Sequence, residues 1–217
     1  MVDFDPQSSL TLAMGLKSHD QDLTIADVIL GERVITDAIM PTDAGPDLIP
    51  SNILLSGADV ELTRDPLGAF ALRDAMGRLP TGYDYVILDC PPNLGVLTLG
   101  ALLAAGEVLI PVQASYLALG GVNLLLQTVD KVQRRANPEL AILGILLTMA
   151  DLRTRHARDM ITDTRAALEG KLNVFETVIR SNVRLREAAM VGQNIFAFAP
   201  ESYGAEDYRA LALEVDR

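Results

Sequence analysis

Residues 1–7 read Met-Val-Asp-Phe-Asp-Pro-Gln, a short apolar strand that leads directly into two carboxylates, Asp3 and Asp5. Open α/β sheets bind their ligands outside the carboxyl ends of the strands, so this pattern predicts an acidic site at one sheet edge. Carboxylates at such a place suit a phosphate-bound magnesium ion and an attacking water. The phosphate-binding pattern G-x-x-x-x-G-K-[ST] does not occur in the 217 residues. The segment therefore predicts only the acidic part of a nucleotide-hydrolysing site.

A second acidic motif follows another predicted strand. Residues 83–92 read Tyr-Asp-Tyr-Val-Ile-Leu-Asp-Cys-Pro-Pro, and this strand delivers Asp89 to the same sheet edge before two prolines force a stiff turn. In phosphoryl transfer an acid at this place holds magnesium, usually through a water. Alternatively, Asp89 only ends a strand and opens a loop. Taken with the first motif, it predicts that three carboxylates converge on one edge.

The rest of the chain alternates apolar strands with amphipathic helices, which predicts a doubly wound, mostly parallel α/β sheet with helices on both faces. We expect one domain over residues 1–217. The expected strands are 1–4, 47–50, 84–89, 107–112, 142–148 and 173–179. The expected helices are 8–15, 24–31, 56–62, 67–78, 95–105, 119–136, 154–168, 183–191 and 203–215.

The amino-acid composition bears on disulfides, on the cellular compartment and on membrane insertion. Cys90 is the only cysteine, which excludes an internal disulfide and suits a reducing cytoplasm. It is better interpreted as a small buried thiol than as a nucleophile, because no motif links it to either histidine. Residues 1–20 lack the pattern of a signal peptide. The apolar stretch 90–129 is interrupted by polar residues, prolines and glycines, so we expect core there and no membrane span.

These motifs resemble the ParA/Soj family of partition ATPases, which are deviant-Walker P-loop proteins that segregate chromosomes and plasmids. The resemblance covers nearly the whole chain in the expected order. It runs through Val2–Gln7, Leu48–Asn52, Val86–Pro92, Ile110–Gln113, Gly144–Met149, Val178–Ala188 and Gly204–Ala205.

The resemblance implies a role for each matching residue. Asp5 corresponds to the acid that positions or activates the attacking water, and Asp3 to its neighbour near the metal shell. Asp89 corresponds to the acid that holds Mg²⁺ through a water. Met149 and Pro200 fall where similar proteins border the adenine. The implied cofactors are ATP and Mg²⁺, and the implied partners are a ParB-like centromere-binding protein, nonspecific DNA and a second copy in a homodimer, in the cytoplasm on the nucleoid.

Charge is distributed unevenly and bears on the DNA contact. The net charge is −11, yet residues 131–186 hold 11 Lys and Arg against 6 Asp and Glu. Related proteins bind DNA through arginines near Arg180, Arg184 and Arg186, and clustered positive charge is sufficient for phosphate contact. The alternative is a solvated helix face with intramolecular ion pairs. The acidic helix at 203–215 is interpreted as a solvated face over packed Tyr208, Leu211 and Val215.

The family's first strand, phosphate loop and following helix have no counterpart in the printed sequence. We therefore expect residues 1–217 alone to bind ATP–Mg²⁺ negligibly, because carboxylates without phosphate donors repel a polyanion. A late start codon or truncated record is the favoured explanation. The alternative function is a nucleotide-free binding module of the same fold that keeps partner or DNA contacts without hydrolysis. Membrane-bound division regulators and iron–sulfur reductases of this scaffold fit poorly, since the C-terminus is acidic and there is one cysteine.

Overall fold

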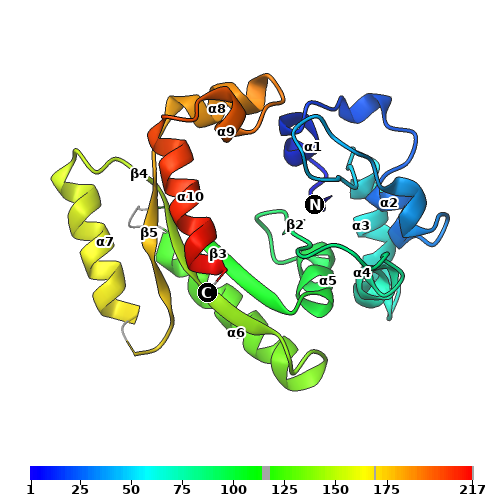
Figure 1. Ribbon diagram of the computed structural model, residues 1–217. Coiled ribbons are helices and arrows are strands. Elements are labelled where there is room, and N and C mark those ends of the chain that lie inside the picture. The colour runs from blue at the N-terminus through cyan, green and yellow to red at the C-terminus, as the bar shows by residue number, and fades with distance from the viewer. Residues whose placement is uncertain (114–117, 169, 217) are drawn as a thin grey trace. The chain divides into compact units, whose positions relative to one another are not determined.

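The computed structural model describes residues 1–113, 118–168 and 170–216 (Figure 1). The chain divides into two compact units. Unit 1 comprises residues 1–105 and 188–194, and unit 2 comprises residues 106–187 and 195–217. The expectation of a single domain over residues 1–217 stays a prediction.

Unit 1 contains two short parallel strands, β1 (Val2–Asp3) and β2 (Leu88–Asp89). Its helical elements are α1 (Ser9–Ala13), η1 (Ser18–Asp20), α2 (Ile25–Ile29), η2 (Ile35–Ala38), α3 (Leu55–Arg64), η3 (Gly68–Phe70), α4 (Ala71–Met76) and α5 (Val96–Ala104). They bury one apolar core around Val2, Phe4, Ile25, Leu55 and Leu72. This core explains why the first predicted strand is apolar.

β1 lies between β2 and the segment around Ile49. The Val2 N–H donates to the Ile87 carbonyl at 2.8 Å and the Asp3 N–H to the Ile49 carbonyl at 3.0 Å. The expected strand at 47–50 forms only isolated bridges, Val2 to Ile49 and Met40 to Leu48. All three segments nevertheless run parallel and end at the same edge, where the sequence predicted that Asp3 and Asp89 would lie.

The expected strand 84–89 is wrong in its length, because only its last two residues are strand. Tyr85, Val86 and Ile87 are 62%, 42% and 55% exposed, whereas a central strand would bury them. Within the described residues β2 pairs only with β1, so its other side lacks the neighbouring strand that would order and cover these residues.

Unit 2 is built on a parallel sheet with the strand order β3-β4-β5. Its strands are β3 (Glu107–Gln113), β4 (Ala141–Ala150) and β5 (Val174–Arg180). Its helices are α6 (Ala118–Arg135), α7 (Arg155–Leu168), α8 (Val183–Met190, whose last turn belongs to unit 1), α9 (Ile195–Phe198) and α10 (Tyr203–Val215).

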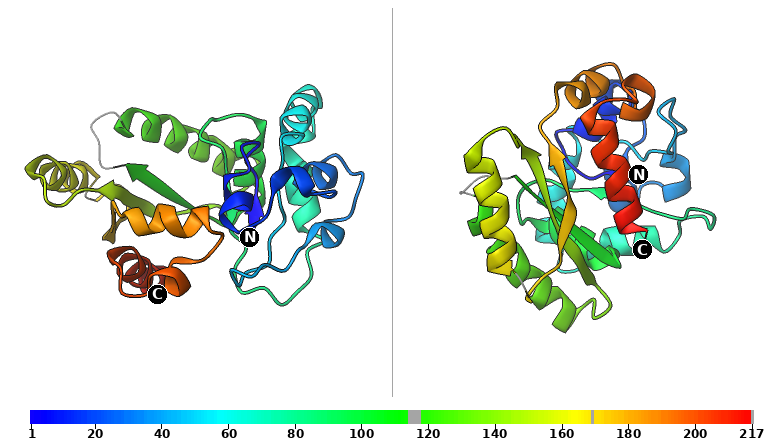
Figure 2. Two further views of the ribbon diagram at one scale, coloured as in Figure 1. Left: turned by 90° about the horizontal axis from the view of Figure 1, so that it is seen from above. Right: turned by 60° about the vertical axis from the view of Figure 1, so that its left-hand side comes forward.

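Helices cover both faces of this sheet. On β4, Ile145 and Leu147 pack against apolar side chains of α6 and α7. Leu146, which points the other way because successive strand residues alternate, packs in a second cluster with Leu211 of α10. Figure 2 shows α7 and α10 on opposite sides of the sheet. The fold is therefore α/β, with parallel strands and helices on both faces of the larger sheet, as predicted.

The interpretation of α10 as a solvated acidic face is wrong for two of its acids. Asp207 is 6% exposed and accepts the backbone N–H of Arg180. The Glu214 carboxylate accepts the backbone N–H groups of Glu176 and Thr177 at 2.6 and 2.9 Å. Both acids satisfy donors of β5, which is an edge strand within the described part of the chain. No described helix is long and apolar enough to span a bilayer.

Candidate functional site

The candidate site lies in unit 1, where β1 and β2 end. The parallel register pairs Asp3 with Asp89, so these two residues lie side by side. Asp5 follows two residues after Asp3, and its N–H donates to Asp3 Oδ1 at 3.2 Å. The charges of Asp3 and Asp5 both act on Asp89. The structure thus brings together the three carboxylates that the sequence predicted to converge.

Asp3 is fully buried, and its carboxylate holds α1 in place. Asp3 Oδ2 accepts the Thr11 N–H at 2.7 Å and the Thr11 hydroxyl at 2.6 Å. Hydrogen bonds to an ionised acceptor are among the stronger ones in proteins. The role of Asp3 near a metal shell stays a prediction, and the visible contacts assign it the positioning of the loop that carries Asp5.

The same network fixes the loop from the other side. Thr11 Oγ1 accepts the Ser51 N–H at 3.0 Å, and the Ser51 hydroxyl donates to the Asp5 carbonyl at 2.9 Å. Ser8 sits in the left-handed region at φ 57°, a conformation that costs a non-glycine residue free energy, and its N–H donates to the Asp5 carbonyl. Strained backbone of this kind clusters at functional sites.

Asp89 carries the electrostatic signature of the site. Partial burial of its carboxylate, then the negative charges of Asp3 and Asp5, raise the pKa of Asp89 above 3.8. The residue itself keeps an exposed surface, so a ligand can reach it. Like charges held together in this way create a demand for a cation.

The donor set fits Mg²⁺ as the sequence suggested, through one acid and a water. Mg²⁺ is usually held by one or two carboxylates together with substrate phosphates and waters. Asp89 and Asp5 Oδ2 offer carboxylate oxygens here, whereas Asp5 Oδ1 accepts the Gln7 N–H at 2.9 Å and Asp3 Oδ2 is engaged by Thr11. Among the described residues, no group of three or more His, Cys, Asp or Glu side chains has the arrangement of a metal site.

Cys90 adjoins this cluster. Burial, followed by the charges of Asp89 and Asp5, raises the pKa of the Cys90 thiol to about 12. The thiol is therefore un-ionised at neutral pH, and thiols attack as thiolates. The structure supports the interpretation of Cys90 as a packed thiol and not a nucleophile.

We expect Asp89→Asn to stabilise the protein at pH 7 by on the order of 0.5–1 kcal/mol, because relieving strain at a functional site commonly gains this much. A raised native pKa means that the native state binds its proton at higher pH than the unfolded state. The advantage of Asp89→Asn should therefore appear above the native pKa and vanish as the pH falls below 3.8.

Thermal unfolding between pH 3.5 and 7.5 measures this difference. Asp84→Asn, an exposed acid of the same segment, serves as the matched control. The electrostatic account would be contradicted if Asp89→Asn did not raise the free energy of unfolding at pH 7. It would also be contradicted if Asp84→Asn raised that free energy equally.

The two residues expected to border adenine lie in unit 2. Met149 is 59% exposed and adopts φ 54° at a β-bulge near the end of β4, where Leu147 pairs with Val178 and Ala150 with Arg180. An exposed methionine held in a left-handed conformation is a candidate ligand contact. Pro200 is exposed, and its carbonyl accepts Arg209 Nη1 at 3.0 Å. Adenine contact by either residue stays a prediction.

The three arginines expected to contact DNA differ in how far they are already paired with acidic side chains of this chain. Arg180 is paired with Asp207 and Glu206 and stacks over the Tyr203 ring at 4.2 Å. Arg184 pairs with Glu187 at 2.8 Å on the exposed side of α8. Arg186 is exposed and has no ion pair within the described residues. Arg186 is therefore the most accessible of the three, followed by Arg184.

Sequence reasoning missed Thr11 and Ser51, which complete the network around Asp3. Thr11 is the one polar residue of the apolar run 10–14 in the predicted helix 8–15, and that signal alone could have marked it. Ser51 lies 40 residues away along the chain, and its contact with Thr11 exists only in the folded protein. No local pattern predicts such a contact.

Comparison with known proteins relates this chain to chromosome partitioning proteins and to solved structures of similar fold. A family model described as an AAA domain matches residues 1–142. The chromosome partitioning protein ParA of Myxococcus xanthus is 41% identical over 216 residues, covering 99% of this chain and 76% of that protein. The sporulation initiation inhibitor protein Soj of Bacillus subtilis is also 41% identical, and the match covers 99% of this chain and 85% of the Soj protein.

Among solved structures, the cobyrinic acid a,c-diamide synthase of Mycobacterium smegmatis with bound ATP analogue and magnesium superposes with a TM-score of 0.83. It is 37% identical, and the match covers 98% of this chain and 80% of that one.

Proposed function

Because the chain belongs to the ParA/Soj family of partition proteins, we propose that it is an ATP-dependent switch for segregating a chromosome or plasmid. The proposed cofactors are ATP and Mg²⁺. The proposed partners are a ParB-like centromere-binding protein, nonspecific duplex DNA and a second copy of the chain. One observation carries the proposal: Asp5 and Asp89 converge where β1 and β2 end, beside the buried Asp3–Thr11 brace.

The geometry supports a division of labour among the acids. Asp89 would hold Mg²⁺ through a water, and the ion would supply positive charge to the phosphate oxygens during transfer. Asp5, on a loop fixed by Ser51 and Ser8, would orient the attacking water and accept its proton. Asp3 would keep that loop in register through Thr11. Buried hydrogen bonds of Asp3, Thr11 and Ser51 thus stabilise the Asp5 loop without using the Asp5 carboxylate, which could then act on the water.

The DNA-binding surface is proposed to centre on α8. Arg184 and Arg186 are both exposed on α8, whereas Arg180 is paired with Glu206 and Asp207 of α10. Phosphate contacts by arginines are sequence-independent and salt-dependent, because each neutralised phosphate releases condensed counterions. We therefore propose that Arg184 and Arg186 contribute more to DNA binding than Arg180.

The test compares the 217-residue chain with the same chain preceded by a strand, a Lys-Gly-Gly-x-Gly-Lys-Thr-Thr phosphate loop and a helix. We expect calorimetry to show no micromolar ATP–Mg²⁺ binding by the first protein, and binding with hydrolysis by the second. In the second protein, Asp5→Ala should abolish hydrolysis while sparing ATP binding. Unchanged hydrolysis by Asp5→Ala would show that Asp5 does not position water.

The same extended protein tests the DNA surface. Replacing Arg184 and Arg186 by Ala should weaken duplex binding and lower the slope of log affinity against log salt by about 0.9 for each phosphate that is no longer neutralised. Arg134→Ala, an exposed arginine at the end of α6, is the matched control. DNA binding without any ATP hydrolysis would favour the nucleotide-free binding module instead.

A further inference from the structure

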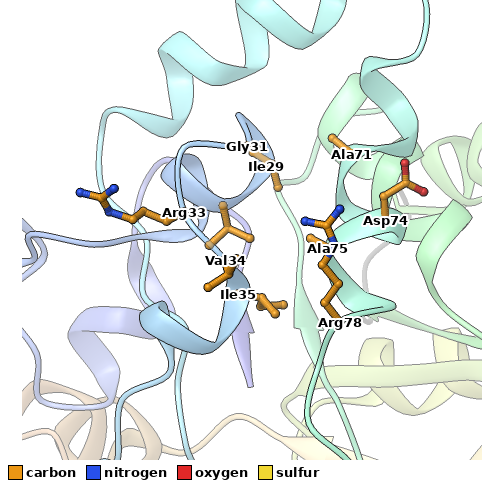
Figure 3. A pocket seen from close by; sticks show the side chains of 10 residues that line it. Ile29, Gly31, Arg33, Val34, Ile35, Ala71, Asp74, Ala75 and Arg78 are labelled. Carbon is orange, nitrogen blue, oxygen red and sulfur yellow. The ribbon is translucent and has the colours of Figure 1, made fainter.

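A groove in unit 1 lies between the end of α2, the turn into η2, and α4 (Figure 3). Its cavity measures about 170 Å³. The apolar walls are formed by Val28, Ile29, Val34, Ile35, Ala71 and Ala75. This groove lies outside the acidic cluster and contains none of its residues.

The groove combines a fixed floor with an open apolar lip. Val28, Ile29 and Ile35 are 5%, 5% and 1% exposed, so they belong to the core and form a rigid base. Val34 is 47% exposed, and Figure 3 shows its side chain directed toward the space facing Ala75. An apolar cavity of about 150 Å³ accepts a molecule the size of benzene. The cavity thus has room for one large aliphatic or aromatic side chain.

The charges at the groove are opposite in sign to those around it. Residues 1–105 carry 15 Asp and Glu but only 5 Lys and Arg, and two of those five, Arg33 and Arg78, line this groove. Neither arginine forms an ion pair with a carboxylate in the described ranges, where the Arg33 guanidinium donates to the neighbouring Glu32 carbonyl. Asp74, the acid on the groove wall, lies 3.7 Å from the Arg73 guanidinium, which offsets its charge.

The position of Arg78 connects this charge to the cavity. In Figure 3 its side chain runs alongside Ala75 toward the space between α4 and the Val34 turn, whereas Arg33 extends outward at the far end. Arginine forms bidentate hydrogen bonds with carboxylates, and its aliphatic stem packs on apolar surface. A ligand that buries an apolar side chain here therefore meets a guanidinium beside the cavity.

We propose that this groove binds an acidic, amphipathic peptide segment of a partner protein. One apolar side chain of the segment fills the cavity, a carboxylate pairs with Arg78, and a further carboxylate lies near Arg33. A basic segment is disfavoured by the two arginines. Duplex DNA gains nothing from the apolar walls, since phosphate oxygens cannot use them. The surface is a partner site additional to the proposed ATP and DNA functions and does not depend on them.

The test uses the 217-residue chain and a fluorescein-labelled peptide, Glu-Asp-Leu-Leu-Glu-Asp-Phe-Leu-Glu, followed by anisotropy. We expect saturable binding that weakens when salt is raised, because exposed charges are screened. Arg78→Glu should weaken binding at least tenfold, and Val34→Asp should do the same by placing charge on the apolar lip. Arg64→Glu makes the same charge change on α3 outside the groove and should leave binding unchanged.

Two further peptides separate the parts of the proposal. Replacing the acids by Lys, or the Leu and Phe residues by Ser, should abolish binding in either case. Circular dichroism confirms that each variant is folded. The proposal is overturned by the absence of saturable binding, by equal binding of the Lys peptide, by an equal weakening in Arg64→Glu, or by displacement of the peptide by duplex DNA at low concentration.

Discussion

Gly192→Ala should lower the free energy of unfolding by about 2–5 kcal/mol, the sum of a left-handed penalty and a packing clash. Gly192 has φ +67°, which an L side chain rarely adopts. An added Cβ would lie 2.4 Å from Gly15 Cα and 2.9 Å from Gly15 N. Both atoms are backbone, so neither can move without displacing the end of α1.

The matched control is Gly31→Ala. Gly31 has φ +77° in the same unit, but an added Cβ there meets nothing within 4 Å. It should therefore cost only the left-handed penalty of about 1–2 kcal/mol. Since 1 kcal/mol shifts the midpoint by about 2–4 °C in a domain of this size, calorimetry resolves the two variants. Equal destabilisation would mean that the close approach of Gly15 and Gly192 relaxes without cost.

The close approach of Gly15 and Gly192 connects the segment 188–194 to the end of α1. The segment 188–194 continues from α8, and Asn194 Nδ2 also donates to the Ala44 carbonyl at 2.9 Å. Gly15 follows α1, the helix that Asp3 holds through Thr11. The glycine pair therefore fixes the far end of the helix whose first turn follows the Asp5 loop.

Asp207→Ala should destabilise the protein by about 2–4 kcal/mol, somewhat below the usual cost of breaking a buried ion pair, because the Arg180 side chain is 26% exposed. The Asp207 carboxylate accepts the Arg180 backbone N–H at 2.8 Å and two guanidinium donors, Nε at 2.9 Å and Nη2 at 2.5 Å. Its removal leaves a backbone donor of β5 unpaired. These hydrogen bonds also raise the pKa of Arg180, which keeps it charged at any accessible pH.

Urea unfolding at constant slope measures the effect. Glu206→Ala is the internal control: Glu206 pairs with the same guanidinium at 2.6 Å, but its side chain is 68% exposed. Exposed pairs contribute at most about 1 kcal/mol, so this variant should change stability little. Similar destabilisation in both variants would show that burial of Asp207 does not set the strength of the pair.

The larger sheet was predictable from the chain because each strand is a continuous apolar run between amphipathic helices. The expected strand 107–112 is observed as Glu107–Gln113, and the expected helix 203–215 as Tyr203–Val215. Burial on both faces leaves only apolar side chains in such strands, so local composition is sufficient. The short elements η1, η2 and α9 carried no comparable periodicity and were missed.

The sequence by itself determined the α/β class, the family and the placing of Asp3, Asp5 and Asp89 at one edge, because carboxyl ends of parallel strands must meet there. The tertiary structure alone decided how those acids differ. Asp3 is engaged by Thr11 while Asp89 stays reachable, and Arg180 is held by Asp207, 27 residues away. Hydrogen bonds and ion pairs depend on distances of a few ångströms between atoms far apart in the chain, and no local residue pattern encodes those distances.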